Sequence, residues 1–347
     1  MLLISQTIHA DTAKIEIQHS NDPNQKTHSY AGKLYWNARD RVWQKKIIVY
    51  KKAPPPPKTH PVWAYVQHLK IPKHYGVKGK DLHYKRFYAT GNCAKKTPLA
   101  NNKAWHIDFN RDTLGAYKVG EAREDWGCPK WMMGVNLLTV VGSPQAYQGK
   151  ALRLQYLKGI GRCVNGKRCV NWKKKLDKPF DRLYFGYRFK FANGFPFVKG
   201  GKLPGIGGGT SNTNGKIPTG YDGWSVRMMW GKQGELVQYV YHPNQPSQFG
   251  DIIPLAIPPI SRGKWYTVQT LVQLNQAGKK NGLIRTWING KVVLNHANMY
   301  FRKGNNLKID RLLFASFYGG NGPQWAPKQD SYSFIDDVRL SPNPVFY

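Results

Sequence analysis

The sequence predicts an all-β protein: a two-sheet antiparallel jelly-roll sandwich with a concave groove, plus a small β-rich region at the N-terminus. From about residue 105 onward, segments rich in β-branched and aromatic residues follow one another. Gly, Pro and Asn turns separate them, and helical periodicity is nearly absent. Eight or more strands spaced in this way are typical of a sandwich of two packed sheets.

The expected strands share alternation and a bulky, apolar composition. They are residues 151–159, 182–191, 224–230, 235–242, 265–275, 283–293, 311–320 and 331–341. Within the sixth segment, the Asn289-Gly290 pair predicts a tight hairpin, because both residues tolerate the left-handed backbone that such a turn needs.

Residues before this region are expected to be organised differently. Residues 1–50 contain alternating segments such as KIEIQ and KLYWNA, which predict a small β-module. Residues 51–104 begin with KKAPPPPKTHP and are read as a proline-rich linker and basic extension, because consecutive prolines exclude helix and central strand. Residues 105–347 form the sandwich domain. The N-terminal part is either an extension packed on that domain or a separate module that binds a cell wall or a polyanion.

The net charge narrows the class of ligand. Lys and Arg number 53 against 19 Asp and Glu, which gives +34. Such a surface attracts polyanions: nucleic acid, an anionic membrane or an acidic polysaccharide. No run approaches the roughly 18 apolar residues of a membrane helix, and MLLISQTIHADTAK is read as neither signal peptide nor anchor.

Four cysteines are too few for a disulfide scaffold, and their spacing suits no zinc site. Cys163 and Cys169 flank a short turn whose ends could meet. A local disulfide and two free thiols remain equally open there. Cys93 and Cys128 carry no interpretation.

The hairpin DGWSVRMMWGKQGELVQYVYH, residues 222–242, holds the main candidate site. A three-residue turn, 232–234, with Gly234 left-handed would place Ser225 opposite Tyr241 and Arg227 opposite Tyr239. All four side chains would then project from one face of the sheet. The other face would turn to the core; it carries Trp224, Val226, Met228, Trp230, Leu236 and Val240. A purely structural role, as aromatic and cation–π pairs, is an equal alternative from spacing alone.

Lys202 lies upstream in FANGFPFVKGGKLPGIGGG, which is read as a glycine-dense loop. No helix pattern follows it, so a phosphate-binding loop is not expected. Glycines there would let a ligand approach the backbone closely.

The residue types favour elimination over hydrolysis. A glycosidase needs two placed carboxylates, and strand parity brings none into the cluster except Glu235 at the turn. Ser225 has no nucleophile-elbow motif. In a uronate polymer, an Arg can neutralise the carboxylate so that C5 loses its proton, while Lys or Tyr side chains act as base and acid. This scheme requires no metal or other cofactor.

Several motifs together resemble polysaccharide lyase family 14, with the closest likeness to its chlorella-virus members, over roughly residues 130–347. They are GKALRLQYLKGIG, FKFANGFPFVKGGKLPGIGGG, GWSVRMMW, YVYHPNQP, WYTVQTLVQLN, WINGKVV, FASFYGG and FIDDVRLS. The resemblance implies a β-jelly roll and cofactor-free β-elimination of alginate, glucuronan or a related cell-wall polyuronate.

By the same resemblance, the catalytic residues are Lys202, Ser225, Arg227, Tyr239 and Tyr241. We assign substrate binding to Lys202, Arg227, Trp230 and Tyr239, and we favour Tyr241 as the proton-transfer residue. The expected partner is an acidic polysaccharide, not nucleic acid or membrane, and the expected state is a monomer. The expected place of action is an extracellular cell wall, reached from a virion or after lysis.

Two other functions remain as alternatives. The same face could bind acidic polysaccharide without catalysis. Nucleic-acid binding fits the charge, but no basic helix or RNP motif accompanies it. The pair Asp336-Asp337 could hold a structural calcium, although a capping or surface role is the simpler interpretation.

Overall fold

A computed structural model describes residues 97–346 except 164–168, 212–214 and 321; before residue 97 it describes the backbone of five strands. These are β1 (Leu2–Gln6), β2 (Thr12–Gln18), β3 (Ser29–Asn37), β4 (Val42–Tyr50) and β5 (Phe87–Tyr88). The chain divides into two compact units, Met1–Cys93 and Ala94–Tyr347.

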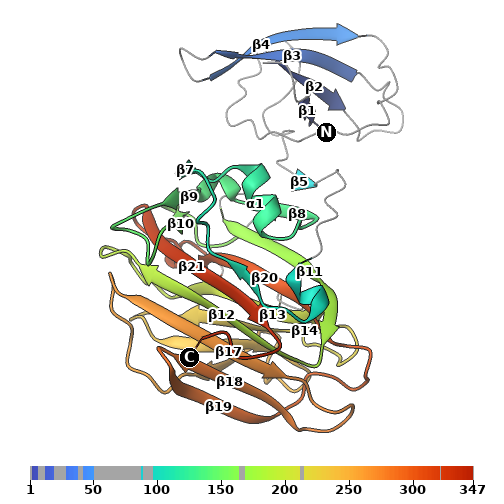
Figure 1. Cartoon of the computed structure of the whole chain (residues 1–347), viewed down its shortest axis with the longest axis vertical. Coiled ribbons are helices and arrows are strands. Elements are labelled where there is room, and N and C mark those ends of the chain that lie inside the picture. Colours follow the sequence, from blue (N-terminus) through green and yellow to red (C-terminus); the bar gives the residue numbers. More distant parts are fainter. Residues whose placement is uncertain are drawn as a thin grey trace. The chain divides into compact units, whose positions relative to one another are not determined.

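In the first unit, β1 to β4 form an antiparallel sheet in sequence order (Figure 1). These strands cover the segments whose alternation predicted a β-module. Most of the predicted linker and basic extension lies outside the described residues. The domain boundaries at 50 and 104, and a wall-binding role for the first unit, therefore stay predictions.

The second unit contains two large sheets. The first runs β19-β18-β17-β12-β21-β10-β9-β7, with β6 beside β21. Its strands are β6 (Trp105–Ile107), β7 (Gly115–Ala116), β9 (Leu138–Val141), β10 (Ala151–Tyr156), β12 (Arg182–Phe191), β17 (Trp265–Gln273), β18 (Gly282–Ile288), β19 (Lys291–Met299) and β21 (Ser331–Ser341).

The second sheet runs β16-β15-β14-β13-β20-β11-β8. Its strands are β8 (Trp131–Met133), β11 (Val170–Phe180), β13 (Gly201–Gly209), β14 (Gly223–Trp230), β15 (Leu236–Tyr241), β16 (Asp251–Pro254) and β20 (Ile309–Tyr318). Outside the sheets lie the helix α1 (Val119–Asp125) and the 3₁₀ turns Pro98–Asn101, Val135–Leu137 and Pro323–Trp325.

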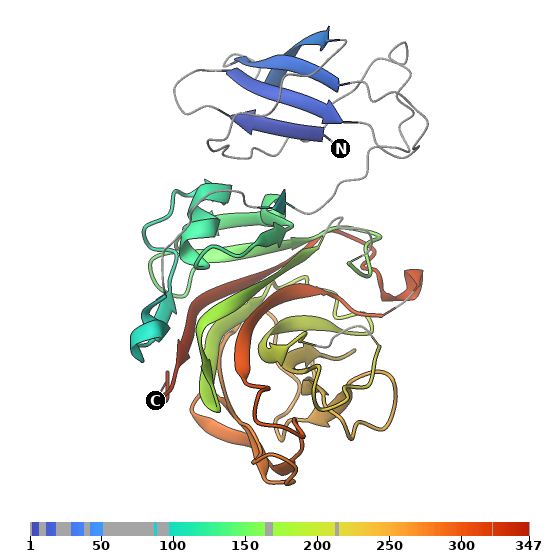
Figure 2. The same cartoon turned by 90° about the vertical axis from the view of Figure 1, so that its right-hand side faces the viewer.

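The predicted all-β two-sheet fold is confirmed. Both sheets are antiparallel, and Figure 2 shows them curving in the same direction. The core between them is largely aromatic and aliphatic, and Trp172, Phe191 and Trp230 are among its fully buried side chains. The face of the second sheet turned away from this core lies on the inside of the curve, and we call it the site face.

The glycine-dense segment around Lys202 was predicted as a loop, and that prediction is wrong. It forms β13, a strand between β14 and β20. Its glycines make room for neighbours: a Cβ on Gly201 would lie 2.1 Å from the Trp230 ring, and one on Gly208 would lie 2.6 Å from Trp224 Nε1. Low strand propensity is overridden here because the adjacent strands supply the bulk.

A buried polar link on β15 crosses the core and joins the two sheets. Gln238 on β15 donates from Nε2 to the hydroxyl oxygens of Thr270 on β17 and Thr286 on β18, both at 2.9 Å. All three residues are buried. Because an unsatisfied buried amide is costly, this link favours the one register of β15 that maintains it.

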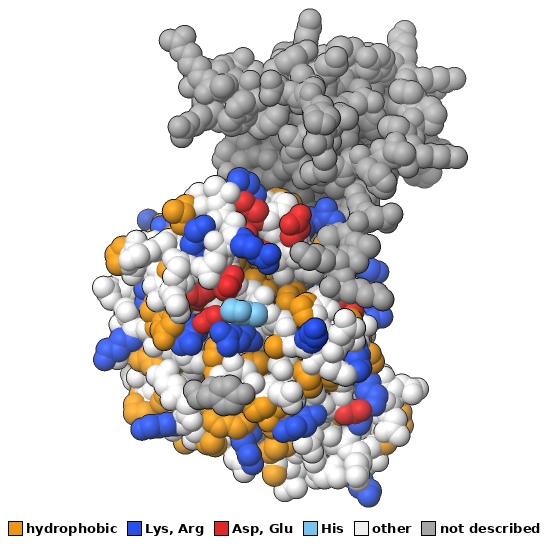
Figure 3. All heavy atoms as spheres, in the orientation of Figure 1, with side chains coloured by type: hydrophobic (Ala, Val, Ile, Leu, Met, Phe, Trp, Pro, Cys, Tyr) orange, Lys and Arg blue, Asp and Glu red, His pale blue; other side chains and the backbone are white. Residues whose placement is uncertain are grey.

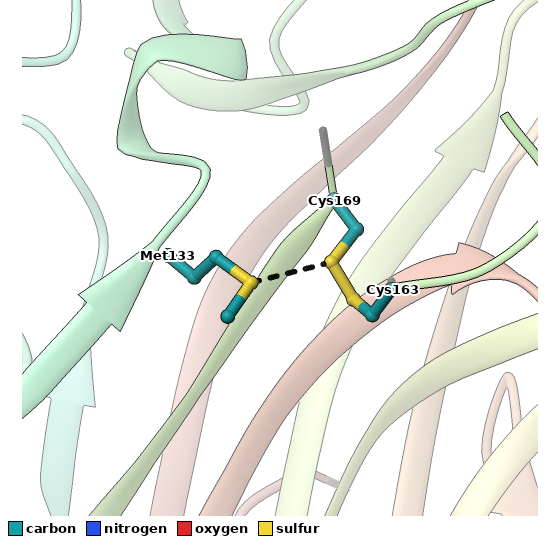
Figure 4. The surroundings of a disulfide bond; sticks show 3 residues. All are labelled: Met133, Cys163 and Cys169. Carbon is teal, nitrogen blue, oxygen red and sulfur yellow. Dashed lines mark hydrogen bonds between the residues drawn. A yellow bond between two sulfur atoms is a disulfide. The ribbon is translucent and has the colours of Figure 1, made fainter. Parts of the chain in front are cut away.

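The question left open for two cysteines is answered by a disulfide between Cys163 and Cys169 (Figure 4). Cys169 Sγ also contacts Met133 Sδ at 3.6 Å, which ties the closed turn to β8. Cys128 is in a disulfide as well. No helix among the described residues is long and apolar enough to cross a membrane.

The outer face of the first sheet carries a charged cluster around Asp337. His106, Arg188 and Arg339 approach its carboxylate at 2.7, 2.6 and 3.1 Å. In Figure 3 acidic and basic side chains lie close together on the face in view. Burial alone would raise the pKa of Asp337, but these hydrogen bonds and charges hold it well below its usual range. The carboxylate considered for calcium thus has three protein partners.

The neighbouring Asp336 generates a prediction about stability. Burial raises its pKa to about 7, so the folded state binds a proton that the unfolded chain releases near pH 4. The contribution of this proton to the free energy of unfolding is therefore present at low pH and is lost as pH rises towards 7. We expect Asp336→Asn to be more stable than wild type at pH 8, by on the order of 2–4 kcal/mol, because it removes the buried charge.

Urea unfolding followed by tryptophan fluorescence between pH 5 and 8 measures this difference. The exposed Glu124 supplies the control Glu124→Gln. Equal pH dependence in wild type and Asp336→Asn would contradict the prediction.

Candidate active site

The predicted register of the hairpin is confirmed. In the pairing of β14 with β15, Ser225 faces Tyr241 and Arg227 faces Tyr239. Gly234 takes a positive φ of 95° in the turn, and Gly231 N–H donates to Glu235 O at 2.7 Å. The alternate side chains of both strands pack in the core, as the alternation predicted.

The site face brings together Lys202, Arg227, Tyr239 and Tyr241. Lys202 comes from β13, where it pairs with Met229 of β14. Met229, Tyr239 and Tyr241 form a hydrophobic cluster separate from the main core. These side chains therefore gather on the side of the second sheet away from the sandwich interior.

The two tyrosines are linked through their hydroxyl groups. Their oxygens lie 3.3 Å apart, and their rings meet edge to face at 5.4 Å. Gly250 N–H donates to Tyr239 Oη at 3.2 Å, and Gly215 N–H donates to Tyr241 Oη at 3.1 Å. Burial and the hydroxyl of Tyr241 raise the pKa of Tyr239, so this phenol keeps its proton at neutral pH.

The Lys202 amine lies in a site without a carboxylate partner among the described residues. Its Nζ is 3.0 Å from Met229 Sδ and 4.1 Å from the centre of the Tyr239 ring. Burial, and secondarily the charge of Arg227, hold the pKa of Lys202 well below the usual value for lysine. The neutral amine, which can accept a proton, is therefore more populated than in an exposed lysine.

Arg227 is buried, and part of its guanidinium is unsatisfied. The residue is 4% exposed, and neither Nε nor Nη2 has a hydrogen-bond partner in the described part of the chain. Its Cζ lies 5.6 Å from the Tyr239 ring centre. Buried donors without acceptors cost free energy, whereas a bound carboxylate could satisfy two of them at once.

The remaining two predicted site residues are placed differently. Ser225 is on the site face by register but has no exposed surface. Trp230 lies on the opposite side of β14, fully buried in the core, and its Nε1 donates to Phe197 O at 3.2 Å. The assignment of Trp230 to substrate binding is wrong, because a side chain enclosed in the core cannot contact a polymer.

Several residues that position the cluster were not predicted. A Cβ on Gly205 would lie 2.8 Å from Arg227 Cγ, so this glycine leaves space for the arginine side chain. A Cβ on Gly319 would lie 3.1 Å from Lys202 Nζ. Met229 could have been found by strand parity, since it alternates with Met228, whereas the contacts of the glycines come from the folded chain.

Comparison with known proteins identifies the family. A model described as polysaccharide lyase 14 matches residues 144–338, more than half of the chain. The chain belongs to polysaccharide lyase family 14. It is accordingly a polysaccharide lyase, as the resemblance predicted. No curated protein sequence matches it significantly.

Solved structures of lyases have the same fold. Alginate lyase Aly36B is 26% identical with a TM-score of 0.61, covering 69% of this chain and 96% of its own. A variant of that lyase in complex with alginate tetrasaccharide is 25% identical, with a TM-score of 0.59 and coverages of 70% and 98%. The marine PL-14 alginate lyase from Aplysia kurodai is 22% identical, with a TM-score of 0.59 and coverages of 68% and 97%.

The expected closeness to viral members is only weakly supported. The alginate lyase from a Chlorella virus is 19% identical, with a TM-score of 0.48, and covers 60% of this chain and 94% of its own.

The close approach of Gly319 to the Lys202 amine leads to a testable prediction about this lyase. Its φ is not in the left-handed region, so Gly319→Ala is compatible with the backbone, but the new methyl group crowds the Lys202 amine. We expect kcat to fall roughly two- to tenfold, because small displacements of a reacting group are costly, while thermal stability changes little.

The matched control is Gly120→Ala in α1, where a Cβ meets nothing within 4 Å. Initial-rate kinetics and a melting curve for both variants are the measurements. An unchanged kcat for Gly319→Ala would show that the amine does not need this space.

Proposed function

We propose that this lyase cleaves uronate-containing polysaccharides by β-elimination on the site face. The observation that carries the proposal is the buried Arg227 guanidinium with unpartnered donors, lying beside an amine whose pKa is lowered. This combination fits an anionic ligand that must be both neutralised and deprotonated.

Arg227 would bind the carboxylate on C5 of the sugar. The C5 proton is acidic only when the charge that develops on this carboxylate in the transition state is stabilised. A planar guanidinium with two free donors can do so with paired hydrogen bonds. Its burial strengthens the interaction, because little water competes there.

Lys202 would act as the base. Its neutral Nζ takes the proton from C5, the C5–H electrons form the C4–C5 double bond, and the C4–O4 bond breaks. The leaving oxygen takes a proton from a tyrosine hydroxyl. The products are a new chain end at O4 and an unsaturated uronate, and no oxidant, reductant or water is consumed.

We assign the proton donor to Tyr239 rather than to Tyr241, which the sequence analysis favoured. Tyr239 is in contact with Lys202 and near Arg227, whereas Tyr241 is 1% exposed. If Tyr241 donates to Tyr239, the proton of Tyr239 is free to point at the substrate. Ser225, enclosed beside Tyr241, would help to orient this pair.

The solved relatives support the substrate class. One variant of Aly36B, in complex with alginate trisaccharide, has a lysine and a methionine replaced by alanine. Another, in complex with alginate tetrasaccharide, has a lysine and a tyrosine replaced by alanine. The site face here brings together Lys202, Met229 and Tyr239. We therefore propose an acidic polysaccharide as the substrate, with alginate, glucuronan and cell-wall polyuronate as candidates. An extracellular place of action and a monomeric state stay predictions.

The direct test is a product assay. Purified protein is incubated with defined oligomers of mannuronate, guluronate and glucuronate. We expect ultraviolet absorbance from the new double bond, in step with new reducing ends. New reducing ends without that absorbance would indicate hydrolysis, and the absence of both with oligomer binding intact would indicate a binding protein.

Removing the base should abolish most of the activity. We expect Lys202→Ala to lower kcat by about 10²- to 10⁴-fold, the usual contribution of a general base, while oligomer binding persists. Lys232→Ala, at the exposed hairpin turn, is the control. Activity of Lys202→Ala within tenfold of wild type would remove Lys202 from the mechanism.

The division between base and acid predicts a pH dependence. Activity should rise with pH as Lys202 loses its proton, with a midpoint below the ordinary pKa of lysine, because the pKa of Lys202 is lowered. Tyr239→Phe should lower kcat by about 10²-fold or more without moving that midpoint upward.

Tyr241→Phe is the comparison for this measurement and should lose less, since we give its hydroxyl a positioning role. The reverse order of the two losses in pH–rate profiles would return the donor role to Tyr241.

A further inference from the structure

The loop from His242 to Gly250, which follows β15, is held in one shape by a buried glutamine. Gln245 is 5% exposed within an otherwise largely exposed segment. Its Oε1 accepts from His242 N–H at 3.1 Å, and its Nε2 donates to Ser247 O at 2.7 Å and Phe249 O at 3.0 Å. With both ends of its amide used, Gln245 restrains this loop.

The end of the loop meets the proposed catalytic tyrosines. Gly250 N–H donates to Tyr239 Oη, and a Cβ on Gly250 would lie 2.8 Å from the Tyr241 ring. One residue earlier, the Phe249 side chain is 51% exposed, although its carbonyl is held by Gln245 and Ser247. An apolar ring on a restrained backbone is thus presented to solvent beside the site.

A second exposed apolar side chain extends the same row. Ile252 on β16 faces Tyr239 in the register, and it is 58% exposed. Directly opposed residues share a face of the sheet, so Arg227, Tyr239 and Ile252 follow one another across three strands of the site face. Asp251 pairs with Val240 and therefore points to the other face.

We propose that Phe249 and Ile252 form a sugar-binding subsite that takes the apolar face of the uronate two units along the polymer from the one held by Arg227. This proposal rests on the proposed function, and it names where the polymer continues. Adjacent strands lie about 4.8 Å apart, which is comparable to the length of one sugar unit. A chain that runs across the strands therefore passes from Arg227 over Tyr239 to the Phe249–Ile252 edge.

Isolated exposed apolar residues are common and carry no meaning by themselves. Here the two lie at one edge, one on the row of the site and the other next to the Tyr239 hydrogen-bond donor. The C–H face of a pyranose needs an apolar surface, and an aromatic ring supplies it without competing for the carboxylate. The subsite would thus add affinity without taking part in proton transfer.

The decisive measurement is binding in the Lys202→Ala background, which removes turnover. Calorimetry with a defined uronate tetramer compares Lys202→Ala alone with Lys202→Ala/Phe249→Ala. We expect the second variant to bind roughly five- to tenfold more weakly, a typical effect for one aromatic contact. Phe249→Trp in the same background should bind at least as well as Phe.

The control is Tyr147→Ala, again with Lys202→Ala. Tyr147 is 47% exposed and packs against Arg188 and Trp265 on the other sheet, so its loss should leave the affinity unchanged. Equal affinities of the Phe249→Ala and Tyr147→Ala variants would overturn the proposal.

Kinetics with the active enzyme separate this proposal from the function on which it rests. Phe249→Ala should raise KM five- to tenfold with kcat changed less than twofold, because the contact is equal in ground and transition states. If the wild-type enzyme makes no unsaturated product, the proposed elimination is refuted. The binding comparison would still test the subsite in that case. Unchanged KM together with unchanged affinity would refute the subsite alone.

Discussion

The antiparallel pairing of β14 with β15 is the constraint on which the site depends. A shift of one residue would turn the site residues of one strand into the core and replace them with apolar side chains. Three features oppose such a shift. First, the hairpin turn closes through Gly234. Second, Trp224 and Trp230 fill the core. Third, Gln238 is hydrogen-bonded to two threonines of the opposite sheet. The polar face is thus fixed by what lies behind it.

In a protein of net charge +34, Arg227 and Lys202 differ from the many other basic residues in their surroundings. Most lysines and arginines of the described residues attract polyanions only from a distance. Arg227 and Lys202 differ because burial removes their water and no carboxylate of the described residues replaces it. Their arrangement costs stability in the free protein, and a bound uronate would recover part of that cost.

Sequence reasoning succeeded where period and turn type decide the outcome. Alternation located the strands, and a three-residue turn sufficed to set Arg227 opposite Tyr239. It failed where neighbouring side chains from other strands decide which structure a segment adopts. The glycines of β13 suggested a loop because the bulk that makes them a strand belongs to Trp224 and Trp230. Trp230 was assigned to substrate although its parity already placed it in the core.

The loop after β15 shows a further limit. Its sequence, HPNQPSQFG, predicts a turn. It does not indicate that Gln245 forms hydrogen bonds with three backbone groups, or that Gly250 N–H donates to a tyrosine hydroxyl. Such hydrogen bonds join residues whose distance in space is set only after the sheet has formed.

The difference between the two tyrosines follows from these loops rather than from the strand they share. Tyr239 and Tyr241 are two residues apart and have the same parity, so the sheet alone makes them equivalent. Each hydroxyl accepts one backbone N–H, from Gly215 for Tyr241 and from Gly250 for Tyr239. Gly250 also packs on the ring of Tyr241, which is 1% exposed, whereas Tyr239 is 7% exposed and its ring lies against Lys202. A fold that provides several candidate acids can therefore favour one of them by burying the others more deeply.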